Sequence, residues 1–349
     1  MKAAIYHGEK SISIEDVDVP VPGPGYVLLE MKCCGICGSD LHSYFGQWGQ
    51  SKNASGHESS GTIVKCGEGV TDFNVGDRVC MECFSHCGKC RYCQTGQYNL
   101  CENLGGTSGG NHSGFAEYVI AHSSSLFRFP DSLSFELGAM IEPLAVSYRA
   151  FHRSRANYQD NVLVIGSGTI GLLATASAKA SGIRNVIATY KYDHQAKIAL
   201  ELGADSVAQT PEQNVRDEIM KLTGKPEVDA IIETTASADG FNLAMSAIRK
   251  GGSLVLVGGY HKALEVNIGR IVGAEINVTG SSCYGYSGMK RDFEWSIDLI
   301  LSNKIPVSKL VTHSFPLSNI QEAFEVSADK KSKSIKVQVY NDQDKMKVK

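Results

Sequence analysis

The pattern of apolar and polar positions changes once along the chain, near residue 135. Before that point, short stretches such as Ser11–Val19 and Tyr26–Lys32 alternate apolar and polar residues, and the run Pro20–Gly25 separates these two. Alternation with a period of two residues predicts strands that bury one face, and proline and glycine predict the turns between them. Further strands are expected at Gly61–Cys66, Asp77–Met81 and Phe115–Ala121. The first part of the chain is therefore predicted to be a β-rich domain.

After residue 135, the apolar residues of Glu136–Arg155 recur with the period of a helix, and Asn161–Gly166 is apolar without interruption. An uninterrupted apolar run is typical of a parallel strand that is buried on both faces. Strand-like and helix-like segments then alternate, which predicts an α/β domain with a doubly wound parallel sheet from about residue 150. Its other expected strands are Asn185–Thr189, Asp229–Glu233, Gly252–Val257 and Asn277–Thr279, and its expected helices are Ile170–Ser181, His194–Leu202 and Phe241–Ile248.

Charge and hydropathy exclude some partners. The 349 residues include 34 Lys and Arg against 37 Asp and Glu, which gives a formal net charge of -3. A chain so close to neutral offers no basic field to a polyanion, so nucleic acid is not an expected partner. No apolar run approaches the roughly 18 residues that span a bilayer, and the first residues lack the apolar core of a secretion signal. We therefore expect a cytoplasmic protein without a membrane partner.

Cysteine is clustered, because all of the 11 cysteines except Cys283 lie in the first third of the chain. In a reducing compartment, such clusters bind metal or carry out redox chemistry more often than they form disulfides. Four of them follow the spacing C-x2-C-x2-C-x7-C: Cys87, Cys90, Cys93 and Cys101. Short spacings let thiolates from one loop converge on a tetrahedral ion, and four thiolates leave no position open. These four cysteines are predicted to bind a structural zinc ion.

A second group of metal-ligand residues is spread more widely along the chain. Cys37 lies in the sequence GICGSDLH, His57 is followed by Glu58, and Glu142 lies in the sequence IEP. One thiolate, one imidazole and one carboxylate leave a vacant position for water or substrate, which is typical of a catalytic zinc ion. Together with a nucleotide-binding fold, these residues predict a second, open zinc site.

With these motifs the chain resembles the zinc-dependent medium-chain alcohol dehydrogenases over nearly its whole length, and it is similar to their sorbitol and threonine dehydrogenase branch. The resemblance implies a Rossmann domain at 150–287 and a β-rich, GroES-like catalytic domain at 1–149 that is completed by 288–349. It also implies hydride transfer between a nicotinamide cofactor and a secondary alcohol or polyol, or the corresponding ketone. A homodimer or homotetramer is expected, with Asn277–Thr279 as the edge strand that pairs between subunits.

The resemblance assigns the catalytic zinc ligands to Cys37, His57 and Glu142. It places at Glu58 the acid that can sit beside the metal or swing onto it.

It places at Ser39 the hydroxyl that takes the proton of the alcohol, and at His42 the outer end of the same proton relay, with Asp40 orienting its neighbours. Without the resemblance, Ser39 and Asp40 could simply make turn hydrogen bonds, and His42 could be merely exposed. The remaining cysteines of the cluster have no matching role and are expected to be core or surface thiols: Cys33, Cys34, Cys66, Cys80 and Cys83.

A glycine-rich motif, G-x-G-x-x-G, follows the first predicted strand of the α/β domain directly. Its glycines permit a tight turn and close approach of the backbone, while the N-terminus of the following helix faces a pyrophosphate. The predicted dinucleotide contacts of this loop are Gly166, Gly168, Thr169, Ile170 and Gly171.

The residues after the second strand of this domain bear on the choice of cofactor. An acid is expected there when NAD is bound, because it holds the adenosine ribose hydroxyls. This sequence has Tyr190 followed by Lys191, and a neutral residue beside a cation favours the 2′-phosphate of NADP(H). If the strand ran three residues longer, Asp193 would be the ribose acid and NAD the cofactor. The resemblance places Val257 and Gly258 at the end of the fourth strand, from which the family contacts the nicotinamide half.

The substrate is less constrained by the sequence. Where sorbitol dehydrogenases have an aromatic residue after the relay histidine and an arginine-tyrosine pair later, this chain has Ser43 and Cys283-Tyr284. Three aromatic residues near the relay could line an apolar pocket or belong to the core: Tyr44, Phe45 and Trp48. Two alternatives stay open, a threonine-type hydroxy-amino-acid dehydrogenase that uses NAD and a non-catalytic NADPH-binding zinc protein.

Overall fold

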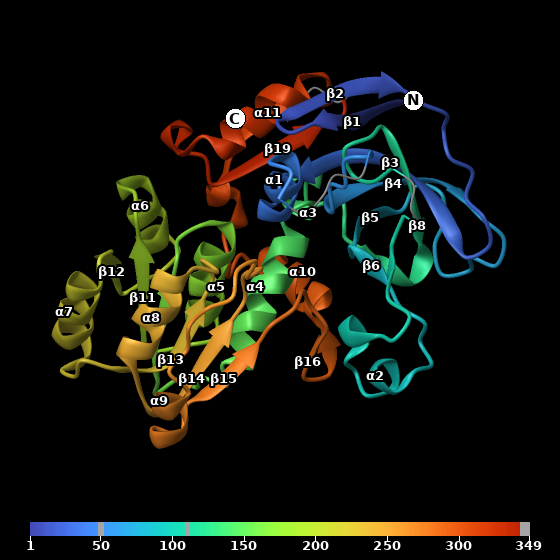
Figure 1. The fold of residues 1–349 in the computed structure, drawn as a ribbon. Helices are drawn as coiled ribbons and strands as arrows, with labels where there is room; N and C mark the ends of the chain where they lie inside the picture. The colour runs from blue at the N-terminus through green and yellow to red at the C-terminus, as the bar shows by residue number, and fades with distance from the viewer. Residues whose placement is uncertain (48–51, 109–111, 343–349) are drawn as a thin grey trace. The chain divides into compact units, whose positions relative to one another are not determined.

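The computed structural model describes residues 1–47, 52–108 and 112–342, and the chain forms two compact units (Figure 1). The first unit consists of Met1–Glu142 together with the chain from Val307 onward, and the second of Pro143–Pro306. Helix α4 (Ile141–Arg153) begins in the first unit and continues into the second. The predicted fold class, a Rossmann sheet with a β-rich GroES-like domain, is confirmed.

The second unit is built on a parallel sheet of six strands in the order β12-β11-β10-β13-β14-β15. The strands are β10 (Asn161–Ile165), β11 (Asn185–Tyr190), β12 (Ser206–Gln209), β13 (Val228–Glu233), β14 (Ile248–Leu256) and β15 (Asn277–Gly280). The helices are α5 (Thr169–Ala180), α6 (Asp193–Glu201), α7 (Glu212–Thr223), α8 (Ala238–Ala247) and α9 (Ile268–Gly273). The strand order reverses between β10 and β13, and ligands of such sheets bind beyond the carboxyl ends of the strands at that point.

Alternate residues of β10 face helices on opposite sides of this sheet. Leu163 and Ile165 join a core that includes residues of α7 and α8, whereas Val162 and Val164 join a core with residues of α4 and α5. Each fully buried aliphatic side chain of this kind contributes about 1.5–3 kcal/mol. Burial on both faces explains why the strand reads as an uninterrupted apolar run.

The pattern of the sequence does not predict β12 or α7. Strand β12 lies at the edge of the sheet, and Ala208 is its only buried residue, so it shows neither alternation nor an apolar run. Helix α7 buries only Val215 and Ile219 among its described side chains and is otherwise polar. A second difference concerns the helix expected at 136–155, which is two helices, α3 (Phe135–Gly138) and α4.

The end of the second unit comprises the hairpin β16 (Tyr286–Ser287) and β17 (Lys290–Arg291), followed by α10 (Asp292–Leu301). Phe293 of α10 packs on Tyr284, with ring centroids 4.7 Å apart, and a carboxylate oxygen of Asp292 lies 3.6 Å from Arg149 of α4. These contacts lie within the second unit, which extends to Pro306, whereas residues 288–306 were expected to complete the first domain.

The first unit contains a sheet of seven strands, in which β8 and β19 pair with different parts of the same edge of β3. The strands of this sheet are β3 (Tyr26–Gly35), β4 (Glu58–Cys66), β5 (Arg78–Met81), β8 (Tyr118–His122), β9 (Leu126–Arg128), β18 (Val311–Pro316) and β19 (Lys336–Tyr340). Outside it lie the pairs β1 (Lys2–Gly8) with β2 (Ser11–Asp16) and β6 (Phe84–Ser85) with β7 (Gly105–Gly106), and the helices α1 (Gly38–Tyr44), α2 (Arg91–Gln94) and α11 (Ile320–Ala328). The C-terminal strand β19 is thus an integral part of a sheet that begins near the N-terminus.

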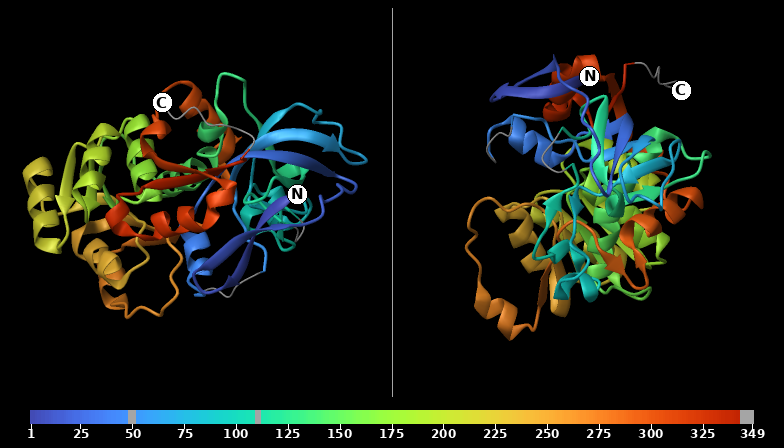
Figure 2. Two further views of the ribbon diagram at one scale, coloured as in Figure 1. Left: turned by 90° about the horizontal axis from the view of Figure 1, so that it is seen from above. Right: turned by 90° about the vertical axis from the view of Figure 1, so that its right-hand side faces the viewer.

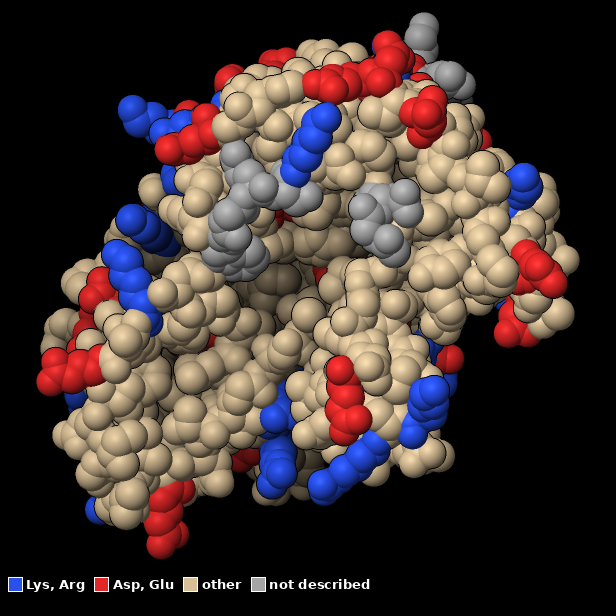
Figure 3. All heavy atoms as spheres, turned by 45° about the vertical axis from the view of Figure 1, so that its right-hand side comes forward, with Lys and Arg blue, Asp and Glu red and all other residues tan. Residues whose placement is uncertain are grey.

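Charged side chains of both signs are interspersed over the face shown in Figure 3, and much of that face carries neither. No helix in the described part of the chain is long and apolar enough to cross a membrane.

Candidate active site and cofactor loop

The four-cysteine loop brings its sulfur atoms together as the spacing predicts. The four Sγ atoms lie within 4.8 Å of one another, with 3.5 Å between Cys90 and Cys93 and 3.5 Å between Cys87 and Cys101. A tetrahedral zinc ion with Zn–S bonds of about 2.3 Å requires sulfur atoms about 3.8 Å apart. The spacing of the sulfur atoms is therefore close to the spacing that a tetrahedral zinc ion requires.

Backbone amides of the loop donate hydrogen bonds to two of the sulfur atoms and lower the pKa values of these thiols. The amides of Lys89 and Cys90 lower the pKa of Cys87 to about 6, and those of Cys93 and Glu102 lower the pKa of Cys90. Desolvation and the neighbouring thiols raise the pKa of Cys93 to about 12. N–H groups that point at sulfur favour the thiolate, which is the form that binds zinc.

Two of the second group of predicted ligands, Cys37 and His57, lie at one end of the β3–β4 ladder. This ladder pairs Gly35 with Glu58, so the chain carries Cys37 just beyond the end of β3 and His57 just before the start of β4. The two side chains are hydrogen bonded to each other. Antiparallel pairing thus brings together two residues that are far apart in the sequence.

Asp40 holds this pair in place from the first turn of α1. It is fully buried, and its carboxylate accepts hydrogen bonds from the Cys37 amide at 2.9 Å and from the Ser55 hydroxyl at 2.8 Å. Its Oδ1 atom lies 4.0 Å from Nδ1 of His57. Asp40 is thus bonded to the backbone of Cys37 and to Ser55, and it also lies near the imidazole of His57.

Glu142 acts on the same imidazole from the start of α4. Burial alone would lower the pKa of His57, but Cys37, Asp40 and Glu142 outweigh it and raise that pKa well above its ordinary value. These ligands are less tightly grouped than the cysteine loop, which is the only set of three or more potential ligand atoms within 4.8 Å of one another in the described part of the chain.

Glu58 forms a buried ion pair with Lys336 of β19. The pattern of the sequence did not indicate this lysine. The lysine Nζ lies 2.6 Å from Oε1 of Glu58, also bonds Oε2, and donates to the carbonyl of Ile36 at 2.9 Å. Both side chains are buried, with 1% and 2% of the residue exposed. Burial would lower the pKa of Lys336, but Glu58 and then Cys37 raise it. Gly35 leaves room for this carboxylate, because a Cβ there would lie 2.1 Å from Oε2.

The residues predicted to form a proton relay, Ser39 and His42, both lie on α1, three positions apart, which places them on one side of the helix. Nδ1 of His42 is 2.5 Å from Oε1 of Gln47. Tyr44 of the same helix is buried and its ring packs on Phe324, so it belongs to the core. Trp48 lies outside the described residues.

The glycine-rich loop connects β10 to α5 in the second unit. Gly166 has a φ of +96°, a value that residues with a side chain rarely adopt. A Cβ on Gly171 would lie 1.7 Å from the carbonyl oxygen of Gly166. Nothing lies within 4 Å of the place where a Cβ of Gly168 would stand, and Thr169 and Ile170 open the helix. The first and third glycines are therefore required by the turn and by its packing, as in dinucleotide-binding loops.

The second strand of the sheet ends at Tyr190, and Asp193 is the first residue of α6. Lys191 is exposed, with its Nζ 5.8 Å from the centre of the Tyr192 ring. Tyr190 is half-buried. Asp193 was expected to hold the ribose hydroxyls only if this strand extended as far as that residue. The strand stops three residues earlier, at Tyr190.

Val257 and Gly258 follow β14 directly and open the loop that leads to α9, which Figure 2 shows in gold to orange. The amide of Val257 donates to the carbonyl of Glu233 at 3.0 Å.

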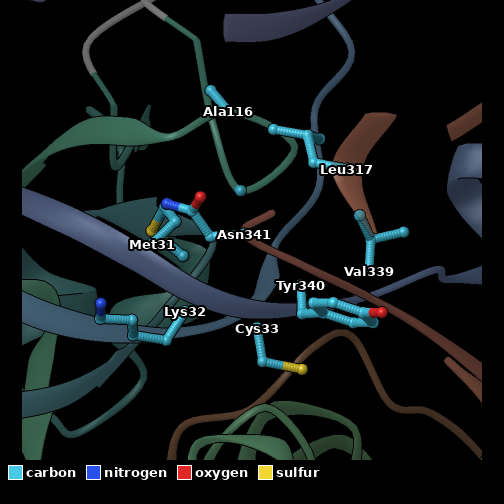
Figure 4. A pocket seen from close by; sticks show the side chains of 9 residues that line it. Met31, Lys32, Cys33, Ala116, Leu317, Val339, Tyr340 and Asn341 are labelled. Atoms are coloured by element: carbon cyan, nitrogen blue, oxygen red, sulfur yellow. The ribbon is translucent and has the colours of Figure 1, made fainter. Parts of the chain in front are cut away.

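A small pocket in the first unit is unrelated to these residues. It lies where β3 and β19 meet, and none of the predicted site residues lines it (Figure 4). Its lining residues are Met31, Lys32, Cys33, Gly114, Ala116, Leu317, Val339, Tyr340 and Asn341.

Comparison with known proteins identifies the family to which the chain is similar. Residues 23–131 match the family "Alcohol dehydrogenase GroES-like domain", and residues 169–302 match "Zinc-binding dehydrogenase". The sorbitol dehydrogenase of Halalkalibacterium halodurans is 36% identical over 343 residues, which cover 97% of this chain and 98% of that protein. The L-threonine 3-dehydrogenase of Stenotrophomonas maltophilia is 31% identical over 340 residues, covering 95% and 98%.

Among solved structures, the 2R,3R-butanediol dehydrogenase of Bacillus subtilis superposes with a TM-score of 0.84 at 33% identity, covering 98% of this chain and 99% of that one. The two family matches together span most of the chain. The relatives are at least 31% identical over nearly its full length. Both findings assign the chain to one family. The chain belongs to the zinc-dependent medium-chain alcohol dehydrogenase family.

Proposed function

We propose that this dehydrogenase transfers a hydride between NADP(H) and a secondary alcohol or polyol, or the corresponding ketone. The observation that carries the proposal is the convergence of Cys37, His57 and Asp40 at the end of the β3–β4 ladder, with Glu142 acting on the same imidazole. A thiolate, an imidazole and a carboxylate form the donor set of an open zinc site. Zinc bound there supplies Lewis-acid polarisation of the substrate oxygen.

In this proposal, neighbouring side chains position the proposed zinc ligands, and two residues of α1 move the proton. Asp40 fixes the backbone of Cys37 and faces His57, while Lys336 keeps Glu58 beside the site as a paired carboxylate. Ser39 accepts the hydroxyl proton of the alcohol, and the imidazole of His42 exchanges it with solvent.

We expect two zinc ions per chain, because the four-cysteine loop also fits one. Cys90→Ser should lower the content to one, measured by elemental analysis of dialysed protein. Cys66→Ser is the matched control, because Cys66 lies outside both ligand sets, and it should retain both ions. One zinc ion in the parent that persists in Cys90→Ser would remove the structural site from the proposal.

NADP(H) is the proposed cofactor because β11 ends at Tyr190 and is followed by an exposed lysine. One ion pair at a partly wet site contributes about 1 kcal/mol, and one with a good hydrogen bond about 1.5–3 kcal/mol, so a preference of roughly tenfold to a hundredfold is expected. Tyr190→Asp should invert this preference by repelling the 2′-phosphate. Lys191→Ala should raise KM for NADP far more than KM for NAD.

Lys197→Ala provides the control, since Lys197 is an exposed lysine of α6 that the proposal does not use. Both Michaelis constants should stay at the parent's values in this variant. A parent enzyme that uses NAD at least as efficiently as NADP would refute the argument from charge and restore Asp193 as the ribose acid.

One alternative is a threonine-type dehydrogenase that uses NAD, which the similarity to an L-threonine 3-dehydrogenase favours. A panel of secondary alcohols, polyols, their ketones and L-threonine, assayed by nicotinamide absorbance with both cofactors, separates the candidates. Reduction of NADP by an alcohol or polyol supports the proposal. Turnover of L-threonine with NAD alone would replace it, and binding of NADPH with no turnover of any class would indicate a non-catalytic protein.

We also propose a homodimer or homotetramer that pairs through β15. Among the described residues β15 pairs only with β14, and Val278 on it is 38% exposed. An open strand edge of this kind can extend a sheet into a second copy. Light scattering at micromolar concentration should give a dimer or tetramer, and Val278→Asp should shift it towards the monomer. A monomeric parent protein would contradict this proposal.

A further inference from the structure

Glu233, the last residue of β13, is fully buried and is held by hydrogen bonds from four neutral donors. The amide of Thr235 donates to Oε1 at 2.7 Å, and the amide of Ala236 donates to Oε2 at 3.1 Å. The hydroxyls of Thr235 and Tyr260 also donate to this carboxylate. Tyr260 comes from a different segment, the loop between β14 and α9, so the carboxylate joins two loops at the carboxyl edge of the sheet.

The turn after β13, residues 234–236, contacts two segments that are proposed to bind the cofactor: the glycine-rich loop and the start of the β14–α9 loop. On one side, the Thr234 hydroxyl lies 3.3 Å from the carbonyl oxygen of Gly166, and a Cβ on Gly166 would be 2.7 Å from Cγ2 of Thr235. On the other side, a Cβ on Gly258 would be 2.4 Å from Cβ of Ala236. The backbones of the glycine-rich loop and of the β14–α9 loop are thus both packed against this turn.

Tyr260 is the side chain that anchors the β14–α9 loop to this arrangement. Residues 257–267 have no regular secondary structure, and the loop is bonded at its first residue by the Val257 amide to the Glu233 carbonyl. The Tyr260 hydroxyl then bonds the side chain of the same glutamate. Burial and this hydrogen bond raise the pKa of Tyr260, so its hydroxyl stays protonated and can donate.

We propose that Tyr260 is a positioning residue for the nicotinamide half of the cofactor, acting through Glu233. Bonds at both ends of 257–260 hold Val257 and Gly258 in one conformation before the cofactor arrives. A preorganised loop binds its ligand more tightly because less order is lost on binding. This inference rests on the proposed dinucleotide-binding function of the second unit.

Tyr260→Phe tests the proposal, because phenylalanine keeps the ring and removes only the donor. Hydrogen exchange in peptides covering 257–267 should become faster. The affinity for NADPH, measured by fluorescence titration, should fall by about tenfold, which corresponds to ~1.4 kcal/mol. The affinity for 2′,5′-ADP, which lacks the nicotinamide half, should change by less than twofold.

Tyr158→Phe is the matched control in the same unit. Tyr158 is 67% exposed, and its hydroxyl accepts a hydrogen bond from the neighbouring Gln159. This variant should behave as the parent protein in all three measurements. In the pair Tyr260→Phe and Glu233→Gln, the losses in NADPH affinity should not add, because both changes break one interaction.

Unchanged exchange in 257–267 together with unchanged NADPH affinity overturns the proposal. Equal losses for NADPH and 2′,5′-ADP also overturn it, since they indicate a general defect of the unit rather than of the nicotinamide half. If the parent protein binds NADH instead, the same comparison is made with NADH and ADP. If it binds neither dinucleotide, the proposed function fails, while the exchange measurement still decides whether Tyr260 anchors the loop.

Discussion

Cys37→Ser is expected to reduce kcat/KM by about a thousandfold or more while leaving the fold intact. Lewis-acid stabilisation by a metal contributes several kcal/mol, and each 1.36 kcal/mol is a factor of ten in rate. Serine keeps the backbone amide that donates to Asp40 at 2.9 Å, so the start of α1 should be preserved. The measurement is steady-state kinetics with the best substrate of the panel, together with zinc content and thermal unfolding.

Cys66→Ser serves again as the control and should retain the parent's kcat/KM. Cys37→Ser should also lose one of the two zinc ions, and its unfolding temperature should stay within a few degrees of the parent's. Activity within tenfold of the parent in Cys37→Ser would refute the assignment of this cysteine to the catalytic centre.

Lys336→Met is expected to lower the free energy of unfolding by about 3–5 kcal/mol, which is the cost of leaving one partner of a buried ion pair without the other. Glu58 would then keep a buried carboxylate whose cation has gone, next to Cys37. The loss can be followed by chemical denaturation monitored by circular dichroism.

The double variant Lys336→Met with Glu58→Gln separates charge from packing. Because it removes both charges, it should recover most of the lost stability, as replacing a whole buried ion pair usually does. A single variant as stable as the parent would show that the pair does not stabilise the sheet. A double variant no more stable than the single one would show that the loss comes from packing.

The sequence predicted best those features whose chemistry is local. The four cysteines lie within 15 residues of one another and converge through the spacing alone. The G-x-G-x-x-G loop can also be recognised from the sequence, because the close packing of Gly171 on the carbonyl of Gly166 involves only residues of the loop itself. The long buried strands were predicted as well, since burial on both faces leaves an uninterrupted apolar run.

Features that depend on long-range pairing were harder to predict. Lys336 begins an alternating strand, KVQVY, and nothing near it in the sequence indicates that it points inward at a carboxylate. The signal was the alternation itself, which places Lys336 and Gln338 on the same side of β19, and both are buried. The edge strand β12 was missed for the opposite reason, because it buries too little to leave a pattern.

The position of β19 in the first unit determines the order in which the protein can be completed on the ribosome. Every residue of the Rossmann unit has been synthesised once Pro306 is added, so this unit can fold while the chain is still growing. The sheet next to the predicted zinc ligands Cys37 and His57 forms later, because Val339 pairs with Cys34 and Lys336 bonds Glu58 across 278 positions of the chain. Until β19 emerges, Glu58 lacks the lysine that pairs with it in the folded protein, so the sheet beside Cys37 and His57 can be completed only after the whole Rossmann unit has been synthesised.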